Sequence, residues 1–231
     1  MSDWINTALF GVYPYICLSV LVLGSIVRFD REQYTWRSQS SQLLRRRQLV
    51  WGSNLFHIGI LVIFVGHAGG LLTPVSVFDA LGISHTAKQL MAVTIGGIAG
   101  VFCLIGLVML LHRRLADPRI RVNSSAADIA VLVLLLAQLL LGLGSIFVSL
   151  NHLDGSEMVA LMGWAQHVVT LRPGAAEFVA GVSIVFKIHL VLGMTILLVV
   201  PFTRLVHIWS APIWYLGRRG YQIVRTKRAT G

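Results

Sequence analysis

Four histidines lie in or at the ends of strongly apolar stretches, and they are the residues best suited to bind a metal. His57 and His67 are ten residues apart in one stretch, and His189 and His207 are eighteen residues apart in another. A single histidine inside a membrane is usually a packing residue or part of a polar pathway. Two histidines on each of two segments instead predict iron ligation in two haem groups. Ten residues of helix rise about 15 Å, so His57 and His67 serve separate sites.

Other metal centres fit the sequence less well. No histidine pair is joined by Cys, Asp or Glu at the same expected depth, which disfavours zinc. The two cysteines, Cys17 and Cys103, lie inside apolar stretches. An iron–sulfur cluster takes four ligands, so two cysteines are too few for one.

The elements that must position the histidines are membrane helices. The chain has 231 residues, of which 56% are hydrophobic and 12% charged, a composition typical of an integral membrane protein. We predict an all-α fold with five transmembrane helices in one membrane domain, residues 1–231, because no soluble domain fits in the remaining chain. The expected spans are residues 9–27, 49–72, 90–111, 129–150 and 178–206.

The basic residues predict the orientation of this bundle. Sixteen of the 19 Lys and Arg lie in the loops after the first and third spans and in the C-terminal segment. The opposite loops carry only Lys88 and Arg172. The positive-inside rule therefore places the N-terminus outside and the C-terminus in the cytoplasm. Because the net charge of +10 is confined to short loops, it indicates contact with anionic membrane lipid or an acidic partner, and no nucleic acid.

The antiparallel course of the second and fifth spans predicts which histidines pair. His57 and His207 share the cytoplasmic side, and His67 and His189 share the outer side, so each pair could hold one six-coordinate haem b. Eighteen residues make five helical turns, which puts His189 and His207 on one helix face. Their separation of about 27 Å nevertheless exceeds the 15 Å of the other two ligands. We expect helix tilt and a kink at Pro201 to absorb this difference.

Two further patterns bear on function. Glycines on the second span, including Gly66, Gly69 and Gly70, predict room for a planar cofactor, with close helix packing as the alternative. All nine acidic residues lie outside the span centres. A proton pump or ion-coupled transporter usually carries a carboxylate in mid-membrane, so this distribution favours electron transfer.

Several stretches together resemble the gamma subunit of bacterial respiratory nitrate reductase, in order and over nearly the whole chain. The stretches are Tyr13–Ile16, Gln33–Arg37, Asn54–Leu61, Phe64–His67, Asp154–Met158, Gly163–Gln166, His189–Thr195 and Arg204–Ser210. The resemblance implies a dihaem cytochrome b of the bacterial inner membrane that oxidises quinol, menaquinol or ubiquinol, near the outer face and releases the protons outside. The implied partners are an iron–sulfur beta subunit and a molybdenum-cofactor alpha subunit on the cytoplasmic side, serving nitrate respiration and nitrate assimilation.

The resemblance also implies roles for single residues. It makes His67 and His189 the ligands of the distal haem iron, near the quinol, and His57 and His207 those of the proximal haem iron. Lys88 matches the family's quinol-site lysine, and Gly66 flanks that pocket. On the residues alone, Lys88 would be read as an interfacial lysine whose ammonium reaches out to water.

Two other functions stay open at the level of sequence. One is a dihaem cytochrome b that serves another cytoplasmic reductase, of the sulfite or heterodisulfide type. The other belongs to a different class, a haem-free membrane anchor or transporter. A reduced haem spectrum separates the second from the rest, and the identity of co-purifying subunits separates the two reductases.

Overall fold

The computed structural model describes residues 3–32, 34, 44–151 and 154–210, and every regular element within these ranges is helical. Five helical segments are long and apolar enough to cross a membrane, which confirms the predicted fold class. They are α1, η1 and α2 in continuation (Asp3–Thr7, Ala8–Val12 and Tyr13–Arg31), α3 (Arg46–Leu72), α5 (His85–Ala116), α7 (Ala126–Asn151), and α10 with η3 (Ile184–Val199 and Val200–Phe202). The shorter elements are α4 (Val75–Ala80), α6 (Pro118–Val122), α8 (Ser156–Val169), α9 (Ala175–Val179) and η4 (Arg204–Ser210).

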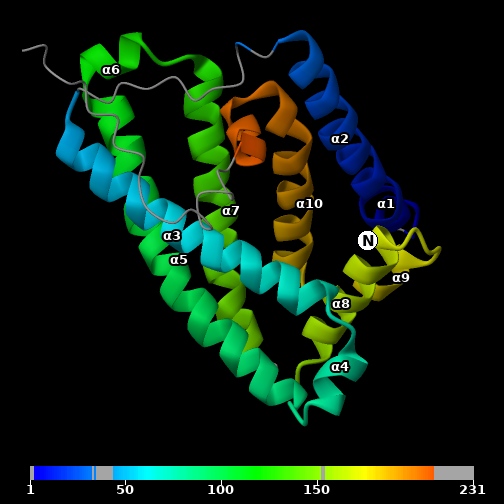
Figure 1. Cartoon of the computed structure of the whole chain (residues 1–231). Coiled ribbons are helices and arrows are strands. Elements are labelled where there is room, and N and C mark those ends of the chain that lie inside the picture. Colours follow the sequence, from blue (N-terminus) through cyan, green and yellow to red (C-terminus); the bar gives the residue numbers. More distant parts are fainter. Residues whose placement is uncertain (1–2, 33, 35–43, 152–153, 211–231) are drawn as a thin grey trace, which may run out of the picture.

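The long helices are neighbours in the order α3, α5, α7, α10 and α2 (Figure 1). One end of the bundle, which we call the arginine end, holds α6, η4 and every described arginine except Arg172. They are Arg28, Arg31, Arg45, Arg46, Arg47, Arg113, Arg114, Arg119, Arg121 and Arg204. The opposite end, called here the α8 end, holds α4, α8 and α9. Basic residues of the C-terminal segment beyond residue 210 lie outside the described residues.

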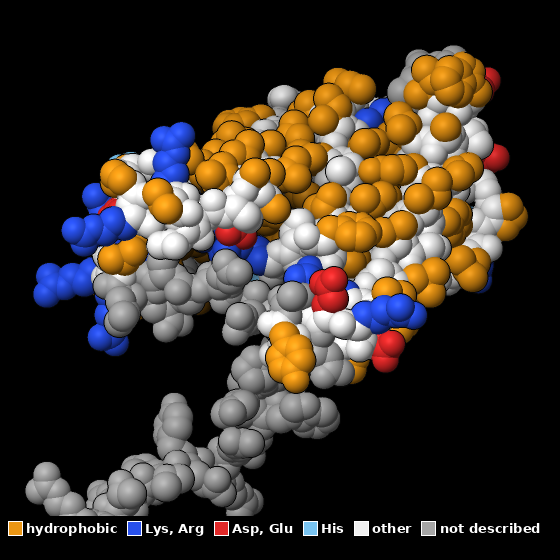
Figure 2. Space-filling view, turned by 90° about the horizontal axis from the view of Figure 1, so that it is seen from above, with side chains coloured by type: hydrophobic (Ala, Val, Ile, Leu, Met, Phe, Trp, Pro, Cys, Tyr) orange, Lys and Arg blue, Asp and Glu red, His pale blue; other side chains and the backbone are white. Residues whose placement is uncertain are grey.

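The flanks of the bundle are apolar, as a lipid-facing surface requires. Large hydrophobic side chains such as Leu61, Val65 and Phe147 are exposed along α3 and α7. Seen from the arginine end, Lys and Arg side chains gather there while apolar side chains cover much of the surface in view (Figure 2). A composition of this kind suits hydrocarbon outside and a bundle held by helix–helix packing inside.

Close packing of α3 on α5 depends on glycines. A Cβ on Gly59 would lie 2.6 Å from the Ala99 carbonyl oxygen and 2.7 Å from the Cys103 amide nitrogen. A Cβ on Gly106 would collide with the Phe56 amide nitrogen and come within 2.7 Å of the Gly52 carbonyl oxygen. Small residues let the two backbones touch, which is how helices associate where lipid provides no hydrophobic driving force.

The segment between α7 and α10 packs into the bundle more deeply than a loop would. Its helix α8 buries Met162 and Trp164, and the Trp164 indole Nε1 donates a hydrogen bond of 2.9 Å to the Phe10 carbonyl oxygen of η1. Phe10 itself is 1% exposed. The α8 end is thus closed by a packed helix that joins the first and last parts of the chain.

The fifth membrane helix is shorter at both ends than the expected range of residues 178–206. Phe178 belongs to α9, and the turn that follows, which contains Gly181, ends before Ile184 opens α10. At the other end α10 stops at Val199, because Pro201 has no amide hydrogen to continue the helix. Thr203 is extended (φ −127°, ψ 178°), so η4 lies beside the end of α10 instead of prolonging its axis (Figure 1). The expectation that His189 and His207 share one helix face is therefore wrong.

The glycine contacts between α3 and α5 make a testable prediction. Gly106→Ala should lower the stability of the bundle by about 1–3 kcal/mol, the usual cost of overpacking, because the new methyl meets rigid backbone. Thermal unfolding of the detergent-solubilised protein, followed by circular dichroism, would measure the change. Gly96→Ala on the same helix is the matched control, because a Cβ there would meet nothing within 4 Å. Equal stability of the two variants would contradict the assigned packing role.

Candidate functional site

The four membrane histidines come together as two pairs, one toward each end of the bundle. The ring centroids of His57 and His207 are 6.3 Å apart near the arginine end, with an angle of 68° between the ring planes. The ring centroids of His67 and His189 are also 6.3 Å apart, nearer the α8 end, with an angle of 41°. The pairs are those that the antiparallel topology predicts.

The separation of the rings suits one iron between each pair. Metal–imidazole bonds of about 2 Å on either side, together with the distances from nitrogen to ring centre, place two ligating rings roughly 6 Å apart. Direct stacking or hydrogen bonding would bring the rings closer. The spacing therefore matches bis-histidine ligation of one metal per pair.

Three of the histidines are held in the tautomer that a haem iron requires. The Nδ1 atom of His57 lies 2.7 Å from the carbonyl oxygen of Ser53. The Nδ1 atom of His67 lies 2.9 Å from the carbonyl oxygen of Ile63, and that of His207 lies 2.6 Å from the carbonyl oxygen of Arg204. A carbonyl can only accept, so Nδ1 must carry the hydrogen in each ring. The neutral imidazole then keeps its lone pair on Nε2, available to a metal.

His189 is held differently, by a residue that the sequence analysis did not select. The Gln138 side chain of α7 lies 3.3 Å from His189 Nε2 and donates a bond of 3.2 Å to the His189 carbonyl oxygen. His189 Nδ1 is buried and has no hydrogen-bond partner among the described residues. The Gln138 amide nitrogen can only donate, so His189 Nε2 accepts and Nδ1 carries the hydrogen, the same tautomer as in the other three rings. The residues present therefore fit a haem iron at Nε2, where it would take the place of the Gln138 contact.

Two glycines make room for the Gln138 side chain beside His189. A Cβ on Gly142 would lie 3.1 Å from His189 Cε1, and one on Gly193 would lie 3.1 Å from Gln138 Nε2.

Gln138 is a lone amide in the middle of a leucine-rich membrane helix. A polar side chain in that position needs a partner, and by this rule the sequence does point to it.

Lys88 lies at a junction of four helices near the α8 end. Its Nζ donates a 3.0 Å hydrogen bond to the Gly70 carbonyl oxygen of α3 and lies 2.8 Å from the Met162 sulfur of α8. The same atom is 3.7 Å from the ring centre of Phe78 in α4. Lys88 is 8% exposed, so it does not reach out to water as an interfacial lysine would. A buried ammonium of this kind needs a functional or structural reason.

The glycines of α3 divide into two groups. Gly59 is buried against α5, so the packing alternative holds for it. A Cβ at Gly66, Gly69 or Gly70 would meet no atom within 4 Å. Gly66 lies next to His67, and Gly70 binds Lys88, so this open stretch of α3 joins the outer histidine pair to the lysine. Room for a planar group beside this stretch stays a prediction.

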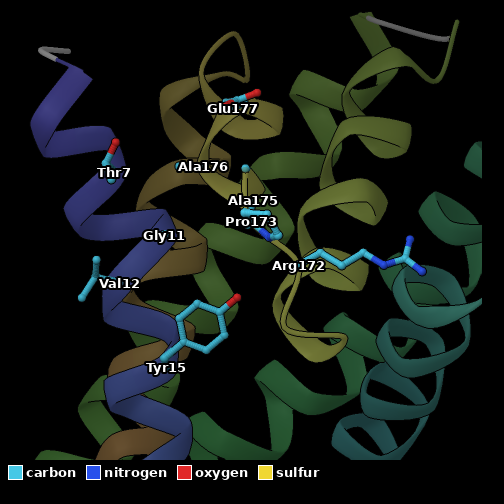
Figure 3. A pocket seen from close by; sticks show the side chains of 10 residues that line it. Thr7, Gly11, Val12, Tyr15, Arg172, Pro173, Ala175, Ala176 and Glu177 are labelled. Atoms are coloured by element: carbon cyan, nitrogen blue, oxygen red, sulfur yellow. The ribbon is translucent and has the colours of Figure 1, made fainter.

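A pocket of about 270 Å³ lies elsewhere at the α8 end, between the start of the chain and the segment that carries α9 (Figure 3). Its lining residues are Thr7, Gly11, Val12, Tyr15, Arg172, Pro173, Gly174, Ala175, Ala176 and Glu177. The Arg172 guanidinium points away from Tyr15 and Glu177 in Figure 3. Neither Lys88 nor any of the four membrane histidines lines this pocket, so it is separate from the candidate site.

Comparison with known proteins identifies the family. The family model for the nitrate reductase gamma subunit matches residues 6–227. The chain is 54% identical to the respiratory nitrate reductase 2 gamma chain of Escherichia coli strain K12 over 99% of this chain and 100% of the relative. It is 52% identical to the respiratory nitrate reductase 1 gamma chain of the same strain, over 97% and 99%. It is 39% identical to the nitrate reductase gamma chain of Bacillus subtilis strain 168, over 95% and 97%.

These matches correct one expectation and confirm another. The E. coli relatives are respiratory proteins, and respiration is a different process from nitrate assimilation, so the expected role in assimilation is dropped. The resemblance to the nitrate reductase gamma subunit, drawn from stretches spread along the sequence, is confirmed over nearly the full length. The chain belongs to the nitrate reductase gamma subunit family, the multi-pass inner-membrane subunits of respiratory nitrate reductase.

Proposed function

We propose that this chain is a dihaem cytochrome b that oxidises quinol near the α8 end and passes electrons to partner subunits at the arginine end. The observation that carries the proposal is the pair of 6.3 Å histidine contacts, one toward each end of the bundle. When bound, each b haem supplies an iron that accepts and releases one electron at a time. His67 and His189 would hold the distal haem, and His57 and His207 the proximal one.

The orientation follows from the charge of the loops. By the positive-inside rule the arginine end faces the cytoplasm and the α8 end faces outward. Quinol oxidation yields one quinone, two protons and two electrons. The protons leave at the outer face while the electrons cross inward, so turnover moves charge across the membrane without a carboxylate in mid-membrane.

Lys88 has a specific use at the quinol. Its present partners include the Met162 thioether, which is a weak acceptor. A quinol oxygen is a better acceptor, and the ammonium would stabilise the negative charge that develops there as the hydroxyl loses its proton. Gly66 and Gly70, open beside His67, would let the ring approach. Menaquinol and ubiquinol both have oxygens that suit this contact.

The partners follow from the family. A gamma chain of nitrate reductase works with the other subunits of that complex, and we assign an iron–sulfur beta subunit and a molybdenum-cofactor alpha subunit to the cytoplasmic side. The family match favours them over the subunits of a sulfite or heterodisulfide reductase. Two low-spin b-haem components in the dithionite-reduced spectrum of the purified chain would exclude the haem-free anchor or transporter, and their absence would refute the proposal.

Replacing an outer histidine should remove one haem and quinol oxidation together. In His67→Ala or His189→Ala the distal iron loses an axial ligand where electrons enter. Nitrate reduction with an artificial donor should persist, because such a donor feeds the cytoplasmic subunits directly. Haem content and the two activities, measured on the same membranes, check this. Two haems and normal quinol turnover in His67→Ala would show that the pairing is wrong.

Replacing an inner histidine should have the complementary effect. In His57→Ala or His207→Ala the proximal haem is lost, and the distal haem stays reducible by quinol but cannot pass electrons on. Redox titration should show a single remaining b component. Simultaneous loss of both components would point to cross-pairing of the ligands or to a shared folding defect, against the proposed assignment.

Lys88→Ala should weaken quinol binding and turnover while both haems remain, because Lys88 does not ligate iron. Quinol-dependent nitrate reduction and the shift of the haem signal on adding a quinol-site inhibitor would measure the loss. Lys187→Ala is the matched control, since Lys187 also binds a backbone carbonyl, that of Ala180 at 2.7 Å, in the same half of the bundle. If Lys88→Ala kept the quinol kinetics and inhibitor affinity of the parent, Lys88 would be a structural residue only.

A further inference from the structure

The segment that carries His207 is held in place by α2. Beyond the end of α10, the carbonyl oxygens of Pro201 and Thr203 both accept hydrogen bonds from Arg28 Nη1, at 2.6 Å and 2.9 Å. A proline break frees carbonyls that the helix would otherwise use, and inside a membrane bundle they must find another donor. Arg28, half-buried near the end of α2, supplies that donor from 173 residues away in sequence.

Two neighbours of Arg28 shape the same contact. Gly24, one turn earlier, packs so closely that a Cβ there would lie 3.0 Å from the Pro201 ring. Ser25 is 7% exposed, and its hydroxyl accepts a 3.1 Å hydrogen bond from the Trp209 indole Nε1. Thus α2 holds the segment both before His207, at Pro201 and Thr203, and after it, at Trp209.

The other side of the segment is held by α5 and α7. Asp128, 8% exposed at the start of α7, accepts a 2.6 Å bond from Arg204 Nε and a 3.2 Å bond from Arg114 Nη1. Arg204 in turn provides the carbonyl that accepts the Nδ1–H of His207 at 2.6 Å. Arg204 therefore links two groups: its side chain binds the buried Asp128 carboxylate, and its backbone carbonyl binds the His207 imidazole.

We propose that Arg28 and Asp128 are positioning residues for the inner haem, and that they fix the place and rotation of the His207 imidazole. This inference rests on the proposed function, in which His207 is an axial ligand. Arg28 binds the backbone carbonyls of Pro201 and Thr203, and Asp128 binds the side chain of Arg204. Both residues act on His207 only through these groups. Among the described residues, His57 and His67 are held instead by their own helix, because their Nδ1 atoms bind the carbonyl four residues earlier.

The arrangement predicts an effect on one haem and not on the other. Without the Arg28 or Asp128 contact, the segment that carries His207 would be held less firmly. The imidazole plane of His207 would then rotate, or the ring would move away from the iron. The low-spin electron paramagnetic resonance signal of a bis-histidine haem depends on the angle between its two imidazole planes. The midpoint potential of the haem depends on its axial ligands. The outer pair, His67 and His189, is not bound by Arg28 or Asp128, and His189 lies twelve residues before Pro201.

The test uses Arg28→Gln and Asp128→Asn in the full chain with its partner subunits. Arg31→Gln is the control for the first, because Arg31 is an exposed arginine of the same helix, one turn later. Asp117→Asn is the control for the second, because Asp117 pairs with Arg45 at 3.0 Å at the same end of the bundle. Arg28→Lys tests rescue, since one ammonium can still reach a carbonyl. Each variant is examined by redox titration and by the low-spin resonance signals of the two haems.

We expect Arg28→Gln and Asp128→Asn to shift the signal and midpoint potential of the inner haem, or to lose it, while the outer haem is unchanged. Both controls should match the parent, and Arg28→Lys should restore part of the inner signal. Unchanged inner haem in Arg28→Gln and Asp128→Asn would overturn the inference, and so would equal loss of both haems, which signals general misfolding. A parent complex without two haem components would instead refute the proposed function itself.

Discussion

The structure depends on bringing two imidazoles to a metal-binding separation across helices that do not pack tightly against each other. The histidines of α3 face those of α10 and η4 at 6.3 Å between ring centres, yet α3 owes its position chiefly to α5. The glycine contacts at Gly59 and Gly106 bring the two backbones together and so fix the histidine-bearing face of α3. A wider contact between α3 and α5 would move both histidines of α3 at once, and both sites would lose their spacing.

Lipid imposes a second requirement, that each polar group in the bundle finds a partner inside the protein. Most nitrogens and carbonyls near the candidate site obey it: backbone carbonyls bind three histidines, Gln138 binds the fourth, and Gly70 binds Lys88. Among the described residues, His189 Nδ1 and Gln138 Oε1 are buried there without a hydrogen-bond partner. The groups that satisfy this rule also orient the chemistry. In a soluble protein, water could satisfy many of them, and their positions would be less constrained.

Much of this was predictable from the sequence, and each failure has a physical reason. Five apolar stretches predicted the five long helices, and their antiparallel course predicted which histidines meet. The periodicity of the fifth stretch failed, because counting turns from His189 to His207 assumes a continuous helix, and Pro201 ends it. Arg28 and Asp128 were not predicted because their importance arises from contacts between distant segments, which no spacing along the chain records. Gln138 does carry a signal in the sequence, as a lone amide in the middle of a leucine-rich helix. Lys88 was assigned by resemblance alone, since its burial depends on α3, α4 and α8.

The break at Pro201 also resolves the conflict between the two ligand spacings. On a continuous helix, His189 and His207 would be about 27 Å apart along the axis, too far to face two histidines separated by about 15 Å on α3. Ending α10 at Val199 and laying η4 beside it shortens that distance without adding or removing residues. The consequence is an asymmetry between the two sites. The outer pair rests on two long helices, whereas the inner pair includes a histidine on the short helix η4, whose position is maintained by contacts from α2, α5 and α7. The inner pair therefore depends on contacts from more of the bundle than the outer pair does.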